Sequence, residues 1–359
     1  MEKIPVYFYV NSIGPDGFFN IAGECAKENS ATRVYLVRGG VSESGKFIEE
    51  VASSLEKEGL FSQHFLSFYG DETDGVYFPD IDVYIFDENR TFFHPSMIDC
   101  AHYTVDLGIS GNRKMLYLNK FLISDAMERE KKFLAKAVKF FSAAKSAGED
   151  IERLSVEAAN AEKIERFVSR FIKREFGTAS TFSGKEYFRI LTSPTPEGMD
   201  FPENTLTKMC PKLYCIDDRT GAVSKLLISQ IRESAMLCGF DVISLLSPFS
   251  KKAEHLIVPE IGLGIITSDD LHRFNGDCLK RVSYTRFAES EKMKKHKSRI
   301  KFNVTARKEL MTQGCFLLGE AKKCREEYLE VYSRSYDRDK INSLAENTTR
   351  EIISFVNCT

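Results

Sequence analysis

A single internal repeat, offset by about 180 residues, constrains the fold of this chain more than any other feature. Residues 12–17 and 193–198 both read Ser-x-x-Pro followed by an acidic residue and Gly. Other matched segments follow in the same order: residues 34–37 with 213–216, Gly59 with Gly239, and residues 78–86 with 258–266. A period this long predicts two duplicated domains instead of a repeat array. We expect these domains at residues 1–177 and 178–359.

Each half is expected to begin with short β-rich runs separated by helices. In the first half these runs are residues 6–10, 33–37, 64–68 and 83–86, and in the second 189–192, 213–216, 242–246 and 263–267. Residues 47–57 carry apolar side chains at helical spacing and are followed by Gly59. Strands that alternate with helices predict a parallel sheet covered on both faces. The expected fold class is therefore α/β, with two parallel-sheet domains.

Both halves become helical after their last expected strand. Phe133, Ala137, Phe141 and Ala144 recur at helical spacing. A second stripe consists of Ile164, Phe167, Val168 and Phe171. Such stripes usually face a hydrophobic core. We therefore expect helical appendages, with the boundary between halves in residues 176–183, where Gly177 breaks the helix.

Composition narrows the classes of function. The formal net charge is −2, so no overall positive field attracts the chain to nucleic acid or anionic lipid. The apolar run at residues 1–10 is too short for a signal peptide, and no long uncharged apolar stretch follows, which predicts a cytoplasmic protein without a membrane segment. Cys210 and Cys215 do not have the spacing of a redox or zinc pair, so we expect reduced, mostly buried thiols.

Residues 40–46 carry the clearest chemical motif. They read Gly-Val-Ser-Glu-Ser-Gly-Lys and fit GxxxxGK, between an apolar strand and a helix. In such a loop, successive backbone N–H groups and the helix N-terminus face one anion, and the lysine reaches the β and γ phosphates. The motif predicts a site for ATP, ADP or phosphate. Its candidate binding residues are Gly40, Ser42, Ser44, Gly45 and Lys46.

Two residues depart from this motif. Phe47 stands where a Ser or Thr would ligate Mg²⁺. Glu43 brings a carboxylate close to the expected phosphate and opposes its binding unless the side chain swings outwards. Downstream, the apolar run at residues 83–86 ends in Asp87, as strands that hold Mg²⁺ do. Asp87 is therefore the candidate Mg²⁺ ligand and the candidate catalytic residue.

The second copy of the loop is degenerate. Asp218 replaces the first glycine, Val223 the second, and Ser224 the lysine, while Lys225 comes one residue late. Thr267 occupies the position of Asp87. Carboxylates at the mouth of the loop and a β-branched residue in its turn predict that the second half binds no phosphate.

Together these segments resemble those of bacterial tandem-repeat P-loop NTPase-like proteins, which are described as ATPases or ATP-binding proteins. In that family each half carries a strand, a Gly-rich loop ending in GKS, a "DGV–IPEL" segment and an apolar strand ending in Asp. Here the corresponding segments are residues 40–46, residues 74–81 and Asp87, and the second half keeps only residues 258–261. The resemblance implies a P-loop NTPase-like fold in each half. It also implies that Gly40, Gly45, Lys46 and Asp87 correspond to the family's site residues, whereas the family's Mg²⁺-binding hydroxyl is missing here.

Two hypotheses of function remain open. In the first, the protein binds a nucleotide or phosphate weakly at the first-half loop, with slow or absent hydrolysis. In the second, it is a pseudo-NTPase that acts as a scaffold or interaction module for an unidentified protein partner. His94 and His102, which follow Asp87, are interpreted as histidines without a catalytic role. The basic residues between 292 and 301 are interpreted as a solvated helix face balanced by Glu289 and Glu291, and not as a nucleic-acid site.

Overall fold

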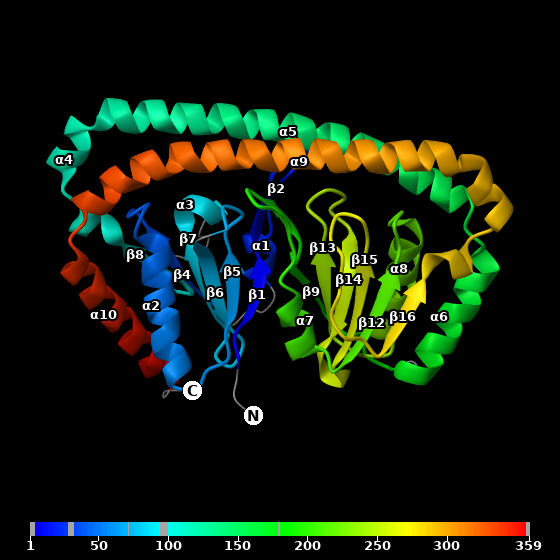
Figure 1. Ribbon diagram of the computed structural model, residues 1–359. Helices are drawn as coiled ribbons and strands as arrows, with labels where there is room; N and C mark the ends of the chain where they lie inside the picture. Colours follow the sequence, from blue (N-terminus) through cyan, green and yellow to red (C-terminus); the bar gives the residue numbers. More distant parts are fainter. Residues whose placement is uncertain (1–3, 28–31, 71, 94–99, 179, 357–359) are drawn as a thin grey trace.

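The computed structural model describes residues 4–27, 32–70, 72–93, 100–178 and 180–356. Two six-stranded sheets stand side by side, and two long helices cross above both of them (Figure 1). The chain is thus an α/β protein, as expected. Within the described residues, no helix is both long and apolar enough to cross a membrane.

The two sheets have the same strand order. The first runs β1-β5-β6-β7-β4-β8 and the second β9-β13-β14-β15-β12-β16. The strands of the first sheet are β1 (Val6–Tyr9), β4 (Arg33–Arg38), β5 (Gln63–Leu66), β6 (Thr73–Phe78), β7 (Val83–Asp87) and β8 (His102–Asp106). Those of the second are β9 (Glu186–Arg189), β12 (Lys212–Asp217), β13 (Val242–Leu246), β14 (Ala253–Val258), β15 (Leu263–Ser268) and β16 (Lys280–Ser283).

The expectation of purely parallel sheets is wrong, because β6 and β14 run antiparallel to both of their neighbours. Only residues 67–72 separate β5 from β6, and only residues 79–82 separate β6 from β7. A parallel pair needs a crossover of a dozen residues or more, so these short connections require antiparallel pairing. All the strands expected from β-rich runs are present, with the largest displacement at β9.

The inner faces of the two sheets share one hydrophobic core. Phe8, Val34 and Phe65 of the first sheet belong to the same buried cluster as Cys215 and Ile243 of the second. Two short helices lie beside this core, α1 (Ala22–Cys25) and α7 (Glu203–Met209). The outer faces are covered by α2 (Ser44–Lys57) on the first sheet and α8 (Ala222–Leu237) on the second.

Equivalent residues of the two halves meet where the sheets join. Tyr9 and Ile190 exchange both backbone hydrogen bonds, at 2.7 and 3.1 Å. The hydroxyl oxygens of Ser12 and Ser193, which the repeat aligns, lie 2.7 Å apart. Contacts between equivalent positions are the mark of a two-fold relation. The serines belong to equivalent hairpins: β2 (Asn11–Gly14) with β3 (Gly17–Asn20), and β10 (Ser193–Thr195) with β11 (Gly198–Asp200).

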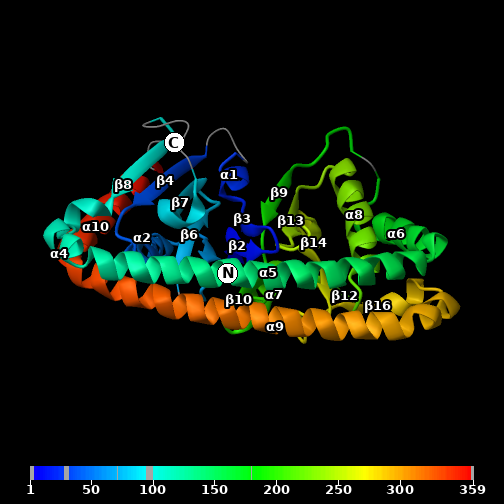
Figure 2. The same ribbon diagram turned by 90° about the horizontal axis from the view of Figure 1, so that it is seen from above.

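The long helices carry each half of the chain across to the other. Helices α5 (Lys120–Glu157) and α9 (Ser290–Ser335) run side by side over both sheets (Figure 2). Beyond α5, α6 (Ala161–Glu175) packs against α8 of the second half, and beyond α9, α10 (Arg338–Val356) packs against α2 of the first. The remaining short helices are η1 (Leu107–Ser110), α3 (Glu88–Thr91), α4 (Arg113–Leu118), η2 (Pro259–Ile261) and η3 (Tyr284–Phe287).

Two equivalent β-bridges hold the chain where it crosses from one half to the other. Ala159, just before α6, pairs with Ala288 of the second half, and Tyr336, just before α10, pairs with Gly111 of the first. Helix α6 ends at Glu175 and Gly177 has a φ of 79°, so the expected helix break is present. The expected boundary between residues 177 and 178 comes after α6, so the first expected domain includes a helix that packs on the second half.

Candidate functional site

The motif at residues 40–46 lies between β4 and α2, in the strand–loop–helix context that the sequence predicts. Gly39 and Gly40 have φ angles of 71° and 57°, which glycine adopts without strain. Helix α2 begins at Ser44, so Lys46 lies within its first turn. Strand β7 is the parallel neighbour of β4, and Asp87 pairs in register with Val37. The loop and the candidate Mg²⁺ ligand therefore lie on adjacent strands.

Three backbone N–H groups of the loop bond within the protein. The Gly40 carbonyl accepts the N–H groups of Glu43 and Ser44, at 2.6 and 2.8 Å. The Gly40 N–H donates to the hydroxyl of Tyr336 at 3.0 Å, so a residue between α9 and α10 closes the turn. A Cβ at Gly40 would lie 2.9 Å from the Leu107 side chain, which shows how closely the turn packs against η1.

The charged groups of the loop pair with each other. The Lys46 side chain is 61% exposed, and its Nζ lies 3.3 Å from Glu43 Oε1. The Glu43 side chain is 4% exposed and also accepts the Ser42 hydroxyl at 3.2 Å. Glu43 therefore does not swing outwards, as phosphate binding would require, and its carboxylate holds the ammonium expected to reach the phosphate.

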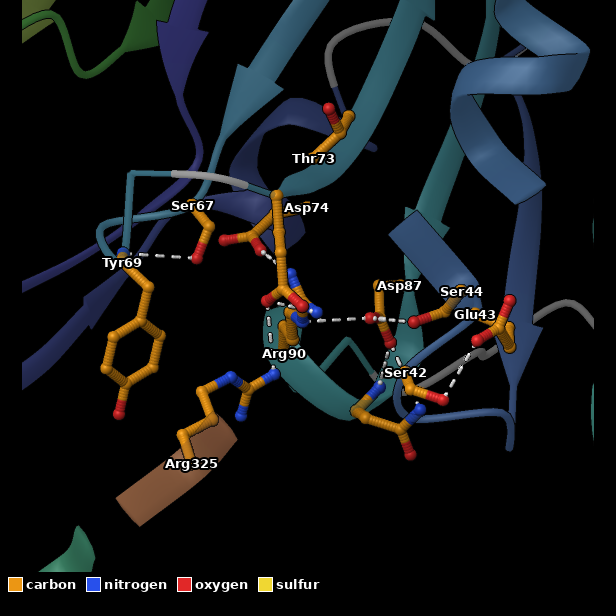
Figure 3. Close-up of polar contacts among 12 residues, drawn as sticks. Ser42, Glu43, Ser44, Ser67, Tyr69, Thr73, Asp74, Asp87, Arg90 and Arg325 are labelled. Carbon is orange, nitrogen blue, oxygen red and sulfur yellow. Dashed lines mark hydrogen bonds and ion pairs between the residues drawn. The ribbon is translucent and has the colours of Figure 1, made fainter. Parts of the chain in front are cut away.

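Asp87 has a hydroxyl partner that the sequence analysis did not assign to it. Ser44 Oγ donates to Asp87 Oδ2 at 2.6 Å, and both side chains are buried (Figure 3). Phe47, at the position where a Mg²⁺-binding hydroxyl was sought, is fully buried between α2 and the sheet. The hydroxyl beside Asp87 thus comes from Ser44, which precedes the Gly-Lys pair, and the motif offered no signal for this pairing.

A buried ionic network extends from Asp87 across the edge of the sheet. The Arg90 guanidinium lies 2.5 Å from Glu72 Oε2, 3.2 Å from Asp74 Oδ1 and 3.2 Å from Asp87 Oδ2. Arg325, from α9, reaches the same Glu72 oxygen at 3.3 Å. Asp74, Asp87, Arg90 and Arg325 lie close together in Figure 3. The network ties the first sheet to the long helix above it.

Burial perturbs the acids of this network. Desolvation is the largest cause and raises the pKa of Asp74 to about 7, against the opposing effect of Arg90. Nearby Asp87 and Glu72 raise it further. Burial also raises the pKa of Asp87, while Arg90 and the hydroxyl of Ser44 lower it.

A cavity of about 230 Å³ lies above this network. Asp74, Arg90 and Arg325 form part of its wall, together with the rings of Phe18 and Phe68. The long helices form the opposite side, through residues such as Met127 and Tyr328. Nothing in the sequence indicated that these residues form one cavity, because they come from segments as far apart as residues 18 and 328.

A second cavity, of about 580 Å³, occupies the equivalent place in the second half. It opens beside Thr220 and Gly221, at the start of α8, and Lys252 stands where the first half has Glu72. Several lining positions of the two sheets correspond, each pair 180 residues apart: Ser67 with Ser247, Tyr69 with Phe249, Asp74 with Glu254, and Asn89 with Asp269. In the long helices, where the matching bridges give an offset of 177 residues, Glu130 corresponds to Arg307 and Gly148 to Arg325. The two halves thus carry pockets at corresponding places, and the charged residues that line them differ.

The second-half loop is closed by its own carboxylate. Asp218 Oδ2 accepts the Ser224 N–H at 2.8 Å, and its Oδ1 accepts the N–H and the hydroxyl of Thr220, at 3.0 and 2.6 Å. Lys225 is paired with Glu152 at 2.5 Å. The Asp218 carboxylate therefore takes the place that an anion would have at the start of α8.

Glu254, His255 and His272 offer ligand atoms within 4.8 Å of one another, and the sequence analysis did not identify this cluster. His255 Nδ1 accepts the Thr267 N–H at 3.0 Å, so the proton of the neutral ring lies on Nε2. Burial, reinforced by His272, lowers the pKa of His255 well below its usual value. A metal needs an unprotonated ring nitrogen, but the Nδ1 of His255 already accepts a hydrogen bond and its Nε2 carries the proton. The three residues therefore do not fit a metal centre.

The remaining sequence-predicted residues lie outside the loop. His102 is buried in β8, its ring edge-on to Phe93, and His94 is outside the described residues. Lys292 pairs with Glu289 and Lys294 with Glu291, which confirms the charge-balanced helix face. Among the cysteines in the described part of the chain, none forms a disulfide and most are buried.

Comparison of this chain with known protein families, curated proteins and solved structures gives no match.

Proposed function

We propose that the protein is a pseudo-NTPase of the cytoplasm, built from two P-loop NTPase-like halves, that acts as a scaffold without bound nucleotide. The observation that carries this proposal is the occupied loop of the first half. The buried Glu43 carboxylate holds Lys46, and the Tyr336 hydroxyl takes the Gly40 N–H. Both groups would have to leave before a phosphate could use the loop.

The Glu43 charge alone opposes a phosphate strongly. Two like charges about 4 Å apart, near a protein surface, repel by about 4 kcal/mol. That energy corresponds to roughly a thousandfold loss of affinity.

The exposed apolar side chains at the corner between α4 and α5 support a scaffold role. Tyr117, Leu118 and Phe121 are all largely exposed there, close together in sequence. Contiguous exposed apolar residues suit contact with another protein. The corner lies at one end of the long helix pair (Figure 1), and none of these three residues lines either cavity.

A second function, weak binding of Mg²⁺ and a nucleotide at the first-half loop, is favoured by the contact between Ser44 and Asp87. A hydroxyl on the helix after the loop, beside an Asp on the adjacent strand, is the pair of groups that holds Mg²⁺ in P-loop enzymes. This function requires the loop to open so that Glu43 moves away.

A thermal-shift titration with ATP, ADP and GTP, each with and without Mg²⁺, distinguishes the two functions. A nucleotide at 100 times its Kd would stabilise the protein by about 2.7 kcal/mol. We expect no shift in the wild-type protein. A wild-type shift that disappears in Lys46→Ala would overturn the scaffold proposal.

Glu43→Gln is the matched variant, because it keeps the size of the side chain and removes its charge. If the carboxylate excludes phosphate, this variant gains nucleotide binding that the wild type lacks. Tyr336→Phe tests the other closing contact by freeing the Gly40 N–H, and the double variant should bind more tightly than either single one.

A further inference from the structure

We propose that the cavity above the first-half ionic network binds a small organic cation, an ammonium or amidinium group carried on an apolar ring. Two deeply buried polar atoms of its wall, Asn11 Oδ1 and Asp74 Oδ2, are hydrogen-bond acceptors without a donor in the part of the chain that the structure describes. This site is separate from the loop at residues 40–46, so its existence does not depend on nucleotide binding.

The orientation of both orphan acceptors is fixed by their other atoms. Asn11 Nδ2 donates to the Arg90 carbonyl at 3.0 Å, which leaves the amide oxygen as the unpaired atom. Asp74 Oδ1 is bound to Arg90 Nη1 at 3.2 Å, which leaves Oδ2. Asn11 is 2% exposed and Asp74 0% exposed. Buried acceptors of this kind require a donor, and an ammonium group supplies three.

The two arginines of the wall are already paired with carboxylates. Each guanidinium nitrogen of Arg90 faces a different carboxylate, those of Glu72, Asp74 and Asp87. Arg325 lies over the ring of Tyr69, 5.0 Å from its centre, and bonds to Glu72 and to the Tyr328 hydroxyl. The Nε atoms of Arg90 and Arg325 have no hydrogen-bond partner among the described residues, but both guanidinium groups are already paired with carboxylates. Counting the partners of the two arginines, four acidic side chains, Glu72, Asp74, Asp87 and Glu130, outnumber the three basic ones, Arg90, Arg325 and Lys131.

Aromatic rings surround the entrance. Phe18 packs against Phe68 and Phe92 with ring centres 5.9 and 5.8 Å apart, and Phe18 and Phe92 are half-exposed. The faces of aromatic rings attract cations. A dry cavity of about 150 Å³ accommodates benzene, so about 230 Å³ holds one ring with a charged substituent.

The second-half cavity is a natural control, because its wall has changed charge. Glu254, which corresponds to Asp74, accepts the Thr192 hydroxyl at 3.2 Å. Arg307 and Lys252 stand where the first half has Glu130 and Glu72. The proposal is therefore confined to the first half.

The test is isothermal titration of the full chain with three probes of similar shape: benzylamine, benzyl alcohol and benzoate. We expect benzylamine to bind at least tenfold more tightly than either of the others. Asp74→Asn should lower benzylamine affinity at least tenfold, and Glu254→Gln should leave it unchanged. Equal binding of the three probes, preference for benzoate, or no binding at all would each overturn the proposal.

The pH dependence gives a second measurement on the wild-type protein, which decides the matter if Asp74→Asn does not fold. Asp74 faces Arg90 of α3, Asp87 of β7, Glu72 beside its own strand and the Tyr9 hydroxyl of β1. Its pKa of about 7 means that the ionised fraction rises about tenfold between pH 6 and pH 8. Benzylamine, charged throughout, should gain about the same factor in affinity and release a proton on binding. An affinity independent of pH would contradict the role of Asp74.

Discussion

Gly314 allows a sharp test of the packing between α5 and α9. A Cβ at this position would overlap Cε1 of Phe141 and lie 2.7 Å from its Cδ1, and the Phe141 ring is fully buried. Gly319, in the same helix, is a matched control, because the nearest atom to its added Cβ is Pro196 Cβ at 3.9 Å. Alanine at Gly314 must therefore move the ring or separate the helices, whereas alanine at Gly319 disturbs nothing.

The expected magnitudes follow from two opposing effects. Alanine stabilises a helix by about 1 kcal/mol relative to glycine, and both variants gain this amount. Overpacking a buried site costs about 1–3 kcal/mol, and only Gly314→Ala incurs it. The difference between the two variants is therefore the overpacking energy alone, about 1–3 kcal/mol in favour of Gly319→Ala.

Urea unfolding followed by far-UV circular dichroism measures this difference. Gly319→Ala should be more stable than the wild type, and Gly314→Ala less stable than Gly319→Ala. Adding Phe141→Leu to Gly314→Ala should recover part of the loss, because the smaller side chain makes room for the methyl group. Equal stabilities of the two alanine variants would refute the close packing of Phe141 on α9.

Three further predictions concern the first half. Phe47→Ser should lower the free energy of unfolding by about 3–5 kcal/mol, as loss of a buried phenyl ring does, and a variant of wild-type stability with improved Mg²⁺ binding would contradict this. Ser44→Ala should cost about 1–3 kcal/mol, because Asp87 loses a buried donor, while exposed Ser53→Ala in the same helix should change stability little in the same urea assay. Because the pKa of Asp74 is higher in the folded than in the unfolded protein, protonation of this residue stabilises the folded state. This stabilisation is fully present at pH values below the pKa of Asp74 in the unfolded chain, and it is lost as the pH rises through about 7. Unfolding midpoints should therefore fall relative to those of Asp74→Asn between pH 5 and pH 8, and a constant difference would refute the shift.

The sequence predicted local structure well and long-range arrangement poorly. The β-rich runs and the apolar stripe of Ile164, Val168 and Phe171 marked elements that are buried in the structure. A stripe indicates that one face of a helix is covered, but not by which sheet, so the packing of α6 on the second half was not predictable. The antiparallel β6 was missed because residues 74–81 were interpreted as a family segment and not as a strand.

The sequence predicted only those parts of the site that are formed by segments adjacent along the chain. The strand–loop–helix context of residues 40–46 was correct, because it depends on adjacent segments. The direction of the Glu43 side chain and the closing contact from Tyr336 depend on tertiary packing, which the motif does not encode. The pairing of Ser44 with Asp87 and the cavity wall of Asn11, Asp74 and Arg325 join segments far apart in sequence.

The exchange of α6 and α10 has an evolutionary consequence. If one gene once encoded a single copy, its product had no helix of its own to cover the outer face beside α2 or α8, and could obtain one only from a second molecule. Such a protein would be a domain-swapped homodimer, which gene fusion turned into one chain. After such a fusion neither copy could have been discarded, since each would have supplied a part of the other. The pockets would have been free to acquire different charges, and the lining residues of the two halves do differ in charge.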